Sequence, residues 1–241
     1  MARTAPAHLI IAATAAEVAP LHEELEESCS LQLRHGDARR GLLHGAPVAV
    51  ATFGVGKVNT AAGLALAIAR LEPVSVIQVG IGGAFPGFGL SVGDVAVASE
   101  ETHLDSGVIT RDGFEGMERM GLPLLTSPAT YYNRIPVDRE LSSEIAGGVH
   151  PLVPFGTSET VTGVTGAMGT GARFEVAVES MEGAAAAQVA LALEAPFAEV
   201  RGISNTVGER DKARWRIAHA VEMACLAVVE WLHRSGSGEG R

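Results

Sequence analysis

Hydrophobic and polar positions divide the chain into short apolar runs that alternate with amphipathic segments. Continuous apolar runs are typical of strands covered on both faces, whereas apolar residues at helical spacing are typical of helices packed on one side. The strands predicted from this pattern are 8–13, 40–44, 47–53, 74–79, 92–98, 159–164 and 197–203. The predicted helices are 17–27, 57–71, 138–145, 182–193 and 215–233.

Strands and helices alternate over most of the chain, which predicts an α/β domain of three layers. Parallel strands need crossover helices, and these helices cover both faces of the sheet. No linker or internal repeat divides the sequence, so we expect one domain over 1–234 and a flexible tail over 235–241. Residues 108–135 lack clear periodicity, and we interpret them as a mobile loop or lid.

Composition narrows the classes of function. The 241 residues are 47% hydrophobic and 19% charged, as in globular proteins, and the net charge is −10. A negative chain offers no positive field to nucleic-acid phosphates or to an anionic membrane, so neither is an expected partner. No apolar run reaches the roughly 18–20 residues of a membrane helix, and the N-terminal run does not resemble a signal peptide.

Cysteine and histidine spacing gives no sign of a metal or a disulfide framework. Cys29 and Cys225 lie far apart and form no CxxC pair, which indicates a reducing compartment. The eight histidines show no HExxH-like spacing. We therefore expect a cytoplasmic protein without a metal or another cofactor.

Two glycine-rich segments follow predicted strands. The run Gly54-Val55-Gly56-Lys57 is not a phosphate-binding loop, because Ala51 stands at the first glycine position and Lys57 is followed by Val58. The second segment, 80–83, comes at the carboxyl end of a predicted buried strand, where open α/β sheets usually bind ligands. Glycines there let a substrate approach the backbone, although tight packing explains them equally well.

Three polar positions stand at strand or helix ends. Glu182 opens an Ala-rich helix, and Glu17 opens another just after the first strand; an acid in the first helical turn is also favoured by the helix dipole alone. Ser204-Asn205 ends the last predicted strand, where Asn commonly forms turns. Each position is therefore open to a structural or a catalytic interpretation.

Taken together, these segments resemble the nucleoside phosphorylase and nucleosidase superfamily, and within it the methylthioadenosine/S-adenosylhomocysteine nucleosidase branch. The resemblance extends over most of the chain and rests on IIAATAAEV, GVGKVNTAAG, QVGIGGAF, VGDVAVASE and MEGAAAAQVALALEAPFAEVRGISN. It implies a single three-layer α/β/α domain whose twisted mixed sheet curls toward a barrel. It also implies a homodimer or larger homo-oligomer in which a neighbouring subunit lines the pocket.

The resemblance assigns roles to particular residues. Glu17 matches the acid that activates the attacking water, Glu182 the carboxylate that binds the ribose hydroxyls, and Met181 a side chain that packs on the sugar. Asn205 stands at the purine, where the family normally has an Asp that protonates the leaving base. Backbone and side-chain contacts with the substrate are expected from Gly80, Ile81, Gly82 and Ser204.

Asn at position 205 changes the expected base. An ionised Asp only accepts hydrogen bonds, which suits the exocyclic amine of adenine, whereas an Asn amide also donates and can meet a six-keto oxygen. Mismatched polar groups discriminate strongly in buried sites, so hypoxanthine fits better than adenine. Hypoxanthine is the base of futalosine, and GIGGAF, GDVAVASEE and RGISNTVGERDKARWRI are similar to futalosine hydrolases of an alternative menaquinone route.

Two further features bear on the substrate. Hexameric phosphorylases place an Arg and a Ser around the glycine segment, where this chain has Gln78 and Ile81, so water is favoured over phosphate as the nucleophile. Futalosine carries a benzoate on its sugar extension, and Arg210, Arg214 and Trp215 follow the purine segment. One Arg is expected to pair with that carboxylate; an exposed charge at a helix start is the alternative.

Three functions remain open at this point. The first is futalosine hydrolysis with release of hypoxanthine, and the second is a methylthioadenosine or S-adenosylhomocysteine nucleosidase that tolerates Asn205 and releases adenine. The third is a nucleoside-binding module without turnover.

Overall fold

The computed structural model describes residues 8–163 and 169–236. Its strands are β1 (His8–Ala12), β2 (Glu26–Leu31), β3 (Asp37–Leu43), β4 (Ala46–Thr52), β5 (Ser75–Ala84), β6 (Val95–His103), β7 (Gly107–Thr110), β8 (Gly113–Gly116), β9 (Arg134–Pro136), β10 (Leu152–Thr157), β11 (Val178–Ser180) and β12 (Phe197–Thr206). Its α-helices are α1 (Ala19–Glu24), α2 (Lys57–Leu71), α3 (Met117–Met120), α4 (Arg139–Ala146), α5 (Gly169–Phe174), α6 (Gly183–Ala192) and α7 (Ile217–Gly236). Two 3-10 helices, η1 (Ala15–Val18) and η2 (Lys212–Arg214), complete the set.

The central sheet is mixed and partly closed. Its strand order is β11-β10-β6-β12-β5-β1-β4-β3-β2, with β9 beside β6, and β11 also pairs with β5. This second pairing closes β5, β12, β6, β10 and β11 into a ring. Parallel pairs such as β1–β5 and β5–β12 coexist with antiparallel pairs such as β6–β12, which confirms the predicted mixed, barrel-like sheet.

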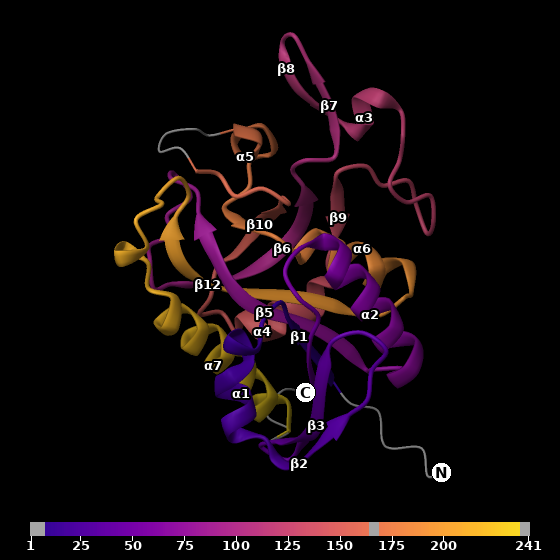
Figure 1. The fold of residues 1–241 in the computed structure, drawn as a ribbon, viewed down its shortest axis with the longest axis vertical. Helices are drawn as coiled ribbons and strands as arrows, with labels where there is room; N and C mark the ends of the chain where they lie inside the picture. Colours follow the sequence, from indigo (N-terminus) through magenta and orange to yellow (C-terminus); the bar gives the residue numbers. More distant parts are fainter. Residues whose placement is uncertain (1–7, 164–168, 237–241) are drawn as a thin grey trace.

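Helices cover the sheet on two sides, as predicted for a three-layer domain (Figure 1). One core packs α1, α4 and α7 against the sheet, with Ile10, Val79 and Trp231 among its buried side chains. A second core packs α2 and α6 on the opposite face, with Leu9 and Leu64 among its members. Neighbouring residues of β1 thus point to opposite faces, both apolar, so a continuous apolar run marks a doubly covered strand.

Several predicted boundaries were wrong. The helix predicted over 17–27 ends at Glu24, and Glu26–Leu31 forms the edge strand β2, whose polar composition gives little strand signal. The strand predicted over 159–164 lies earlier, at Leu152–Thr157; Pro154 at a register shift and Gly156 hide it in the sequence. Residues 159–163 form no strand, and residue 164 lies outside the described residues.

Other segments are more regular than expected. Residues 108–135, interpreted as a loop, contain the end of β7, all of β8, α3 and the start of β9, and Figure 1 shows the β7–β8 hairpin projecting from the body. The segment 80–83 continues β5 instead of forming a loop, and Ser204-Asn205 lies inside β12 instead of in a turn. Helix α7 begins after Trp215 and runs to Gly236, while 237–241 lie outside the described residues.

Candidate active site

A cavity of about 260 Å³ opens where β1, β5, β11 and β12 end. Of the residues predicted for the site, all but Gly80 and Arg214 lie on its wall: Glu17, Ile81, Gly82, Met181, Glu182, Ser204, Asn205, Arg210 and Trp215. Parallel strands β1, β5 and β12 present their carboxyl ends together, which is why segments distant in sequence converge here. The wall is mainly apolar, with a few polar groups at its base.

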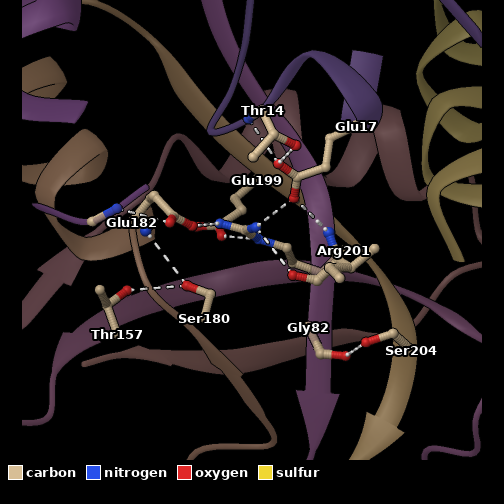
Figure 2. Close-up of polar contacts among 12 residues, drawn as sticks. Thr14, Glu17, Gly82, Thr157, Ser180, Glu182, Glu199, Arg201 and Ser204 are labelled. Atoms are coloured by element: carbon tan, nitrogen blue, oxygen red, sulfur yellow. Dashed lines mark hydrogen bonds and ion pairs between the residues drawn. The ribbon is translucent and has the colours of Figure 1, made fainter. Parts of the chain in front are cut away.

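A buried arginine that the sequence analysis missed holds these polar groups together. Arg201 of β12 is 1% exposed, and Figure 2 shows its guanidinium among three carboxylates. Its Nε lies 2.6 Å from Glu199 Oε1, its Nη2 lies 3.2 Å from Glu182 Oε2, and its Nη1 lies 3.9 Å from Glu17 Oε1. Burial by itself lowers the pKa of Arg201, but these carboxylates outweigh it, so the guanidinium stays charged.

Glu17 is held in place by the start of η1 and by β5. Its Oε2 accepts a hydrogen bond from the Thr14 backbone N–H at 3.0 Å, as in a capping box, and another from Thr14 Oγ1 at 2.9 Å. Its Oε1 accepts a hydrogen bond from the Ile81 N–H at 3.2 Å. The Ile81 carbonyl in turn accepts from Arg201 Nη1 at 3.1 Å. The structural and the catalytic interpretations of Glu17 are therefore compatible, because a capping residue also faces the cavity.

Glu182 does not cap its helix. It occupies the N-cap position of α6, but no cap hydrogen bond forms; its Oε1 instead accepts from the Gly56 N–H at 3.1 Å and its Oε2 faces Arg201. Gly56 has a φ of 94°, so the glycine turn before α2 is what brings this N–H to the site. Burial raises the pKa of Glu182 above its usual value, and Arg201 opposes the rise.

Gly80 lies behind the cavity wall and makes room for the ion cluster. A methyl group built on its Cα would lie 2.5 Å from Glu17 Oε1 and 2.5 Å from Arg201 Nη1. Gly80 is also paired with Arg201 across the β5–β12 ladder. Of the two interpretations of the glycine segment, close packing describes this position, whereas Gly82 combines packing against Val178 with a place on the wall.

Ser204 and Asn205 form a small fixed network at the far end of the cavity. Ser204 Oγ lies 2.8 Å from Asn205 Oδ1 and 3.2 Å from the Gly82 carbonyl oxygen; it has one hydrogen, and the shorter contact is the hydrogen bond that it donates to Asn205. Asn205 Nδ2 donates to the Thr206 carbonyl at 2.9 Å. These contacts fix the amide orientation and leave one N–H and one oxygen lone pair of Asn205 for a ligand.

The cavity rim is built from loops. Trp215 Nε1 donates to the Glu209 carbonyl at 3.0 Å, and the guanidinium of Arg210 lies 5.4 Å from the Trp215 ring centroid. Arg214 forms ion pairs with Glu209 and Asp211, whereas Arg210 forms none with the described residues. Also on the wall, Thr162 donates to Glu179 from its backbone and its hydroxyl, and both residues line the cavity.

Among the described residues, no three His, Cys, Asp or Glu side chains are grouped so that they could hold a metal ion. In the same part of the chain, no helix combines the length and the apolar character needed to cross a membrane.

Comparisons with known proteins agree with this geometry. Residues 7–232 match the model of the phosphorylase superfamily. The chain is 37% identical over 186 residues to a futalosine hydrolase of Thermus thermophilus, covering 76% of this chain and 80% of that one. It is 31% identical over 215 residues to a 5'-methylthioadenosine/S-adenosylhomocysteine nucleosidase of Colwellia psychrerythraea, covering 83% and 84%. A crystal structure of the Colwellia nucleosidase in complex with adenine superposes with a TM-score of 0.82 at 25% identity, covering 96% of both chains.

Proposed function

The chain belongs to the phosphorylase superfamily, in the branch of futalosine hydrolases and methylthioadenosine/S-adenosylhomocysteine nucleosidases, and from this we propose that it hydrolyses the N-glycosidic bond of futalosine and releases hypoxanthine. The observation that carries the proposal is the Asn205 amide, fixed at one end of a cavity whose base holds Glu17 and Glu182. The reaction would belong to an alternative menaquinone route in the cytoplasm.

Charge at the base of the cavity supports glycosidic cleavage. Three carboxylates surround one guanidinium, so the cluster is net negative wherever those carboxylates are ionised. Negative charge beside the sugar stabilises the positive ribosyl oxocarbenium character of the transition state. The same charge repels a phosphate dianion, and Arg201 has its donors directed at Glu17, Glu182, Glu199 and the Ile81 carbonyl, so water is the favoured nucleophile.

Glu17 and Glu182 have different roles in the reaction. Glu17 accepts a proton from the attacking water, because this residue lines the cavity and its Oε1 has one hydrogen bond, from the Ile81 N–H. Glu182 binds the ribose hydroxyls, with Met181 packed on the sugar beside it. Glu182 must be ionised for this role, and the opposing effect of Arg201 on its pKa favours that state.

Base recognition follows from the remaining hydrogen-bonding capacity of Asn205. Its free amide N–H donates to the six-keto oxygen of hypoxanthine, and its carbonyl accepts a hydrogen bond from the ring N–H that forms when the leaving base takes up a proton from solvent. An exocyclic amine in place of the keto oxygen would set donor against donor. This favours futalosine over adenine nucleosides, the substrates of the alternative nucleosidase function.

The benzoate tail fits the rim near Arg210. That guanidinium is exposed, lies over Trp215 and forms no ion pair with the described residues, whereas Arg214 is already paired. A carboxylate there would gain a charge-assisted partner beside an aromatic ring. Arg210 is therefore the better candidate of the two arginines.

We also propose a homodimer or larger assembly. An apolar groove of about 380 Å³ lies between α2 and α6, where Val58 is 79% exposed. Sedimentation velocity at micromolar concentration should give the mass of two or more chains, because this groove would be covered by a second copy. A monomer under those conditions would contradict the assembly.

The substrate tests the function directly. We expect rapid release of hypoxanthine from futalosine, slower release from inosine, which lacks the tail, and little adenine from methylthioadenosine, measured by chromatography. Arg210→Gln should reduce the preference for futalosine over inosine by about tenfold, the scale of one charge-assisted hydrogen bond. Preferred release of adenine would select the nucleosidase alternative, and binding without turnover would select a binding module.

The glutamates test the mechanism. Glu17→Gln and Glu182→Gln should each lower kcat on futalosine by at least about 10²-fold, the scale of lost acid–base or electrostatic assistance. Glu222→Gln, on the exposed face of α7, is the matched control and should retain activity. Circular dichroism should show that all three variants are folded. Near-normal rates in the first two variants would remove both roles.

The Asn205→Asp variant tests how the site recognises the purine base. A carboxylate there faces the Thr206 carbonyl and loses the donor for a six-keto oxygen. We expect kcat/KM for futalosine relative to its six-amino counterpart, which carries the same tail, to fall by about 10–10²-fold. An unchanged ratio would contradict the proposed recognition of the base.

A further inference from the structure

Two buried carboxyl groups lie behind the active site, and neither contacts the substrate in the mechanism above. Glu101 of β6 and Glu199 of β12 are each 0% exposed, and neither is among the residues that line the cavity. Two ionised carboxylates side by side in a protein interior repel each other strongly. The chain must therefore neutralise one of them.

Each of the two carboxyl groups has one oxygen that accepts a hydrogen bond and one oxygen that does not. Glu101 Oε2 accepts from Thr157 Oγ1 at 2.9 Å and from the Thr102 N–H at 3.1 Å. Glu199 Oε1 accepts from Arg201 Nε at 2.6 Å. The second oxygen of each group, Glu101 Oε1 and Glu199 Oε2, meets no donor among the described residues. Buried acceptors without a donor are rare, because each costs its full desolvation energy.

The two oxygens that lack donors point to the same place. A methyl group on Gly183 would collide with both of them, so they approach each other next to the Cα of this residue. A single proton between these oxygens gives both a partner and removes one negative charge. The absence of a side chain at Gly183 leaves the space that the pair occupies directly beneath the start of α6.

We propose that Glu101 and Glu199 share one proton, carried by Glu101, and that this carboxyl pair positions Arg201. The guanidinium contact favours the ionised form of Glu199, which leaves the proton on Glu101. In agreement with this, burial and the neighbouring Glu199 raise the pKa of Glu101 well above its usual value. The pair binds one proton in total, and no covalent bond to carbon is made or broken.

The pair fixes the guanidinium from the side away from the substrate. Glu199 binds Nε, and the planar group then directs Nη1 toward Glu17 and the Ile81 carbonyl and Nη2 toward Glu182. A guanidinium is rigid, so holding one edge sets the direction of the other. Glu199 is thus a positioning residue for both active-site glutamates, and Glu101 keeps it in place as a neutral donor.

Few charged groups act on Glu101. Glu199 and Arg201 both come from β12, while β10 contributes only the Thr157 hydroxyl. Helix α6 contributes Gly183, and Glu182 before it is turned toward Arg201. The protonation of Glu101 in the folded protein therefore depends mainly on the Glu199–Arg201 pair.

Thermal unfolding of Glu101→Gln against pH tests the shared proton without any substrate. Between the ordinary pKa of 4.5 and the raised pKa in the folded protein, wild-type Glu101 is protonated when folded and ionised when unfolded, so its contribution to stability falls as pH rises through this range. Gln cannot ionise. We expect the difference in Tm between Glu101→Gln and wild type to shift in favour of the variant between about pH 5 and pH 9.

The exposed control Glu222→Gln should give a constant difference in Tm over the same range. A constant difference for Glu101→Gln as well would overturn the shared proton. This measurement tests whether the proton is shared even if the Glu199→Gln variant does not fold.

Kinetics test the positioning role, which rests on the proposed function. Glu199→Gln should lower kcat on futalosine by about tenfold or more with a smaller change in KM, because Arg201 loses its anchor. Glu101→Gln should retain more activity than Glu199→Gln, since an amide can replace the neutral donor. The reverse order would place the proton on Glu199 and overturn the assignment. If wild type fails to hydrolyse futalosine, the proposed function fails, and the unfolding series still decides whether the proton is shared.

Discussion

A single buried guanidinium sets the conditions for the whole site. Arg201 is removed from water, and a buried charge persists in a protein only when opposite charges and hydrogen bonds surround it. Glu17, Glu182 and Glu199 provide those charges, and the Ile81 carbonyl provides a further acceptor. Because these partners come from four separate elements, the fold must bring η1, β5, the start of α6 and β12 together before the cluster can form.

The closed ring of the sheet makes this possible. Strand β11 pairs with both β10 and β5, which places the start of α6, and with it Glu182, above the carboxyl ends of β5 and β12. Glycine is required where the backbone and the cluster approach most closely. Gly80 leaves space for Glu17 and Arg201, and Gly183 leaves space for Glu101 and Glu199. These two glycines therefore make room for the ion cluster, not for a ligand.

Much of this arrangement was predictable from the sequence. The long apolar or Ala-rich segments gave β1, α2 and α6 nearly to the residue, because their patterns are strong and local. Strand β10 was missed because Pro154 and Gly156 weaken the local signal, and pairing on both sides compensates for it only in the folded protein.

The resemblance placed Glu17, Glu182 and Asn205 in one site, and the structure brings them to one cavity. Arg201 was missed although Glu199 and Arg201 stand two apart in a buried strand, a spacing that puts both on one face and marks a buried ion pair. The partner of that pair across the sheet, Glu101, depends on strand order, which a local pattern does not reveal.

We infer that this cavity uses water as its nucleophile, because its only buried cation among the described residues is already bound by carboxylates. The most direct measurement is the rate of hypoxanthine release from futalosine as inorganic phosphate is increased, with the sugar product identified by phosphorus NMR. We expect a rate independent of phosphate and a sugar product without phosphorus. A rate that rises with phosphate, together with a sugar phosphate, would contradict it.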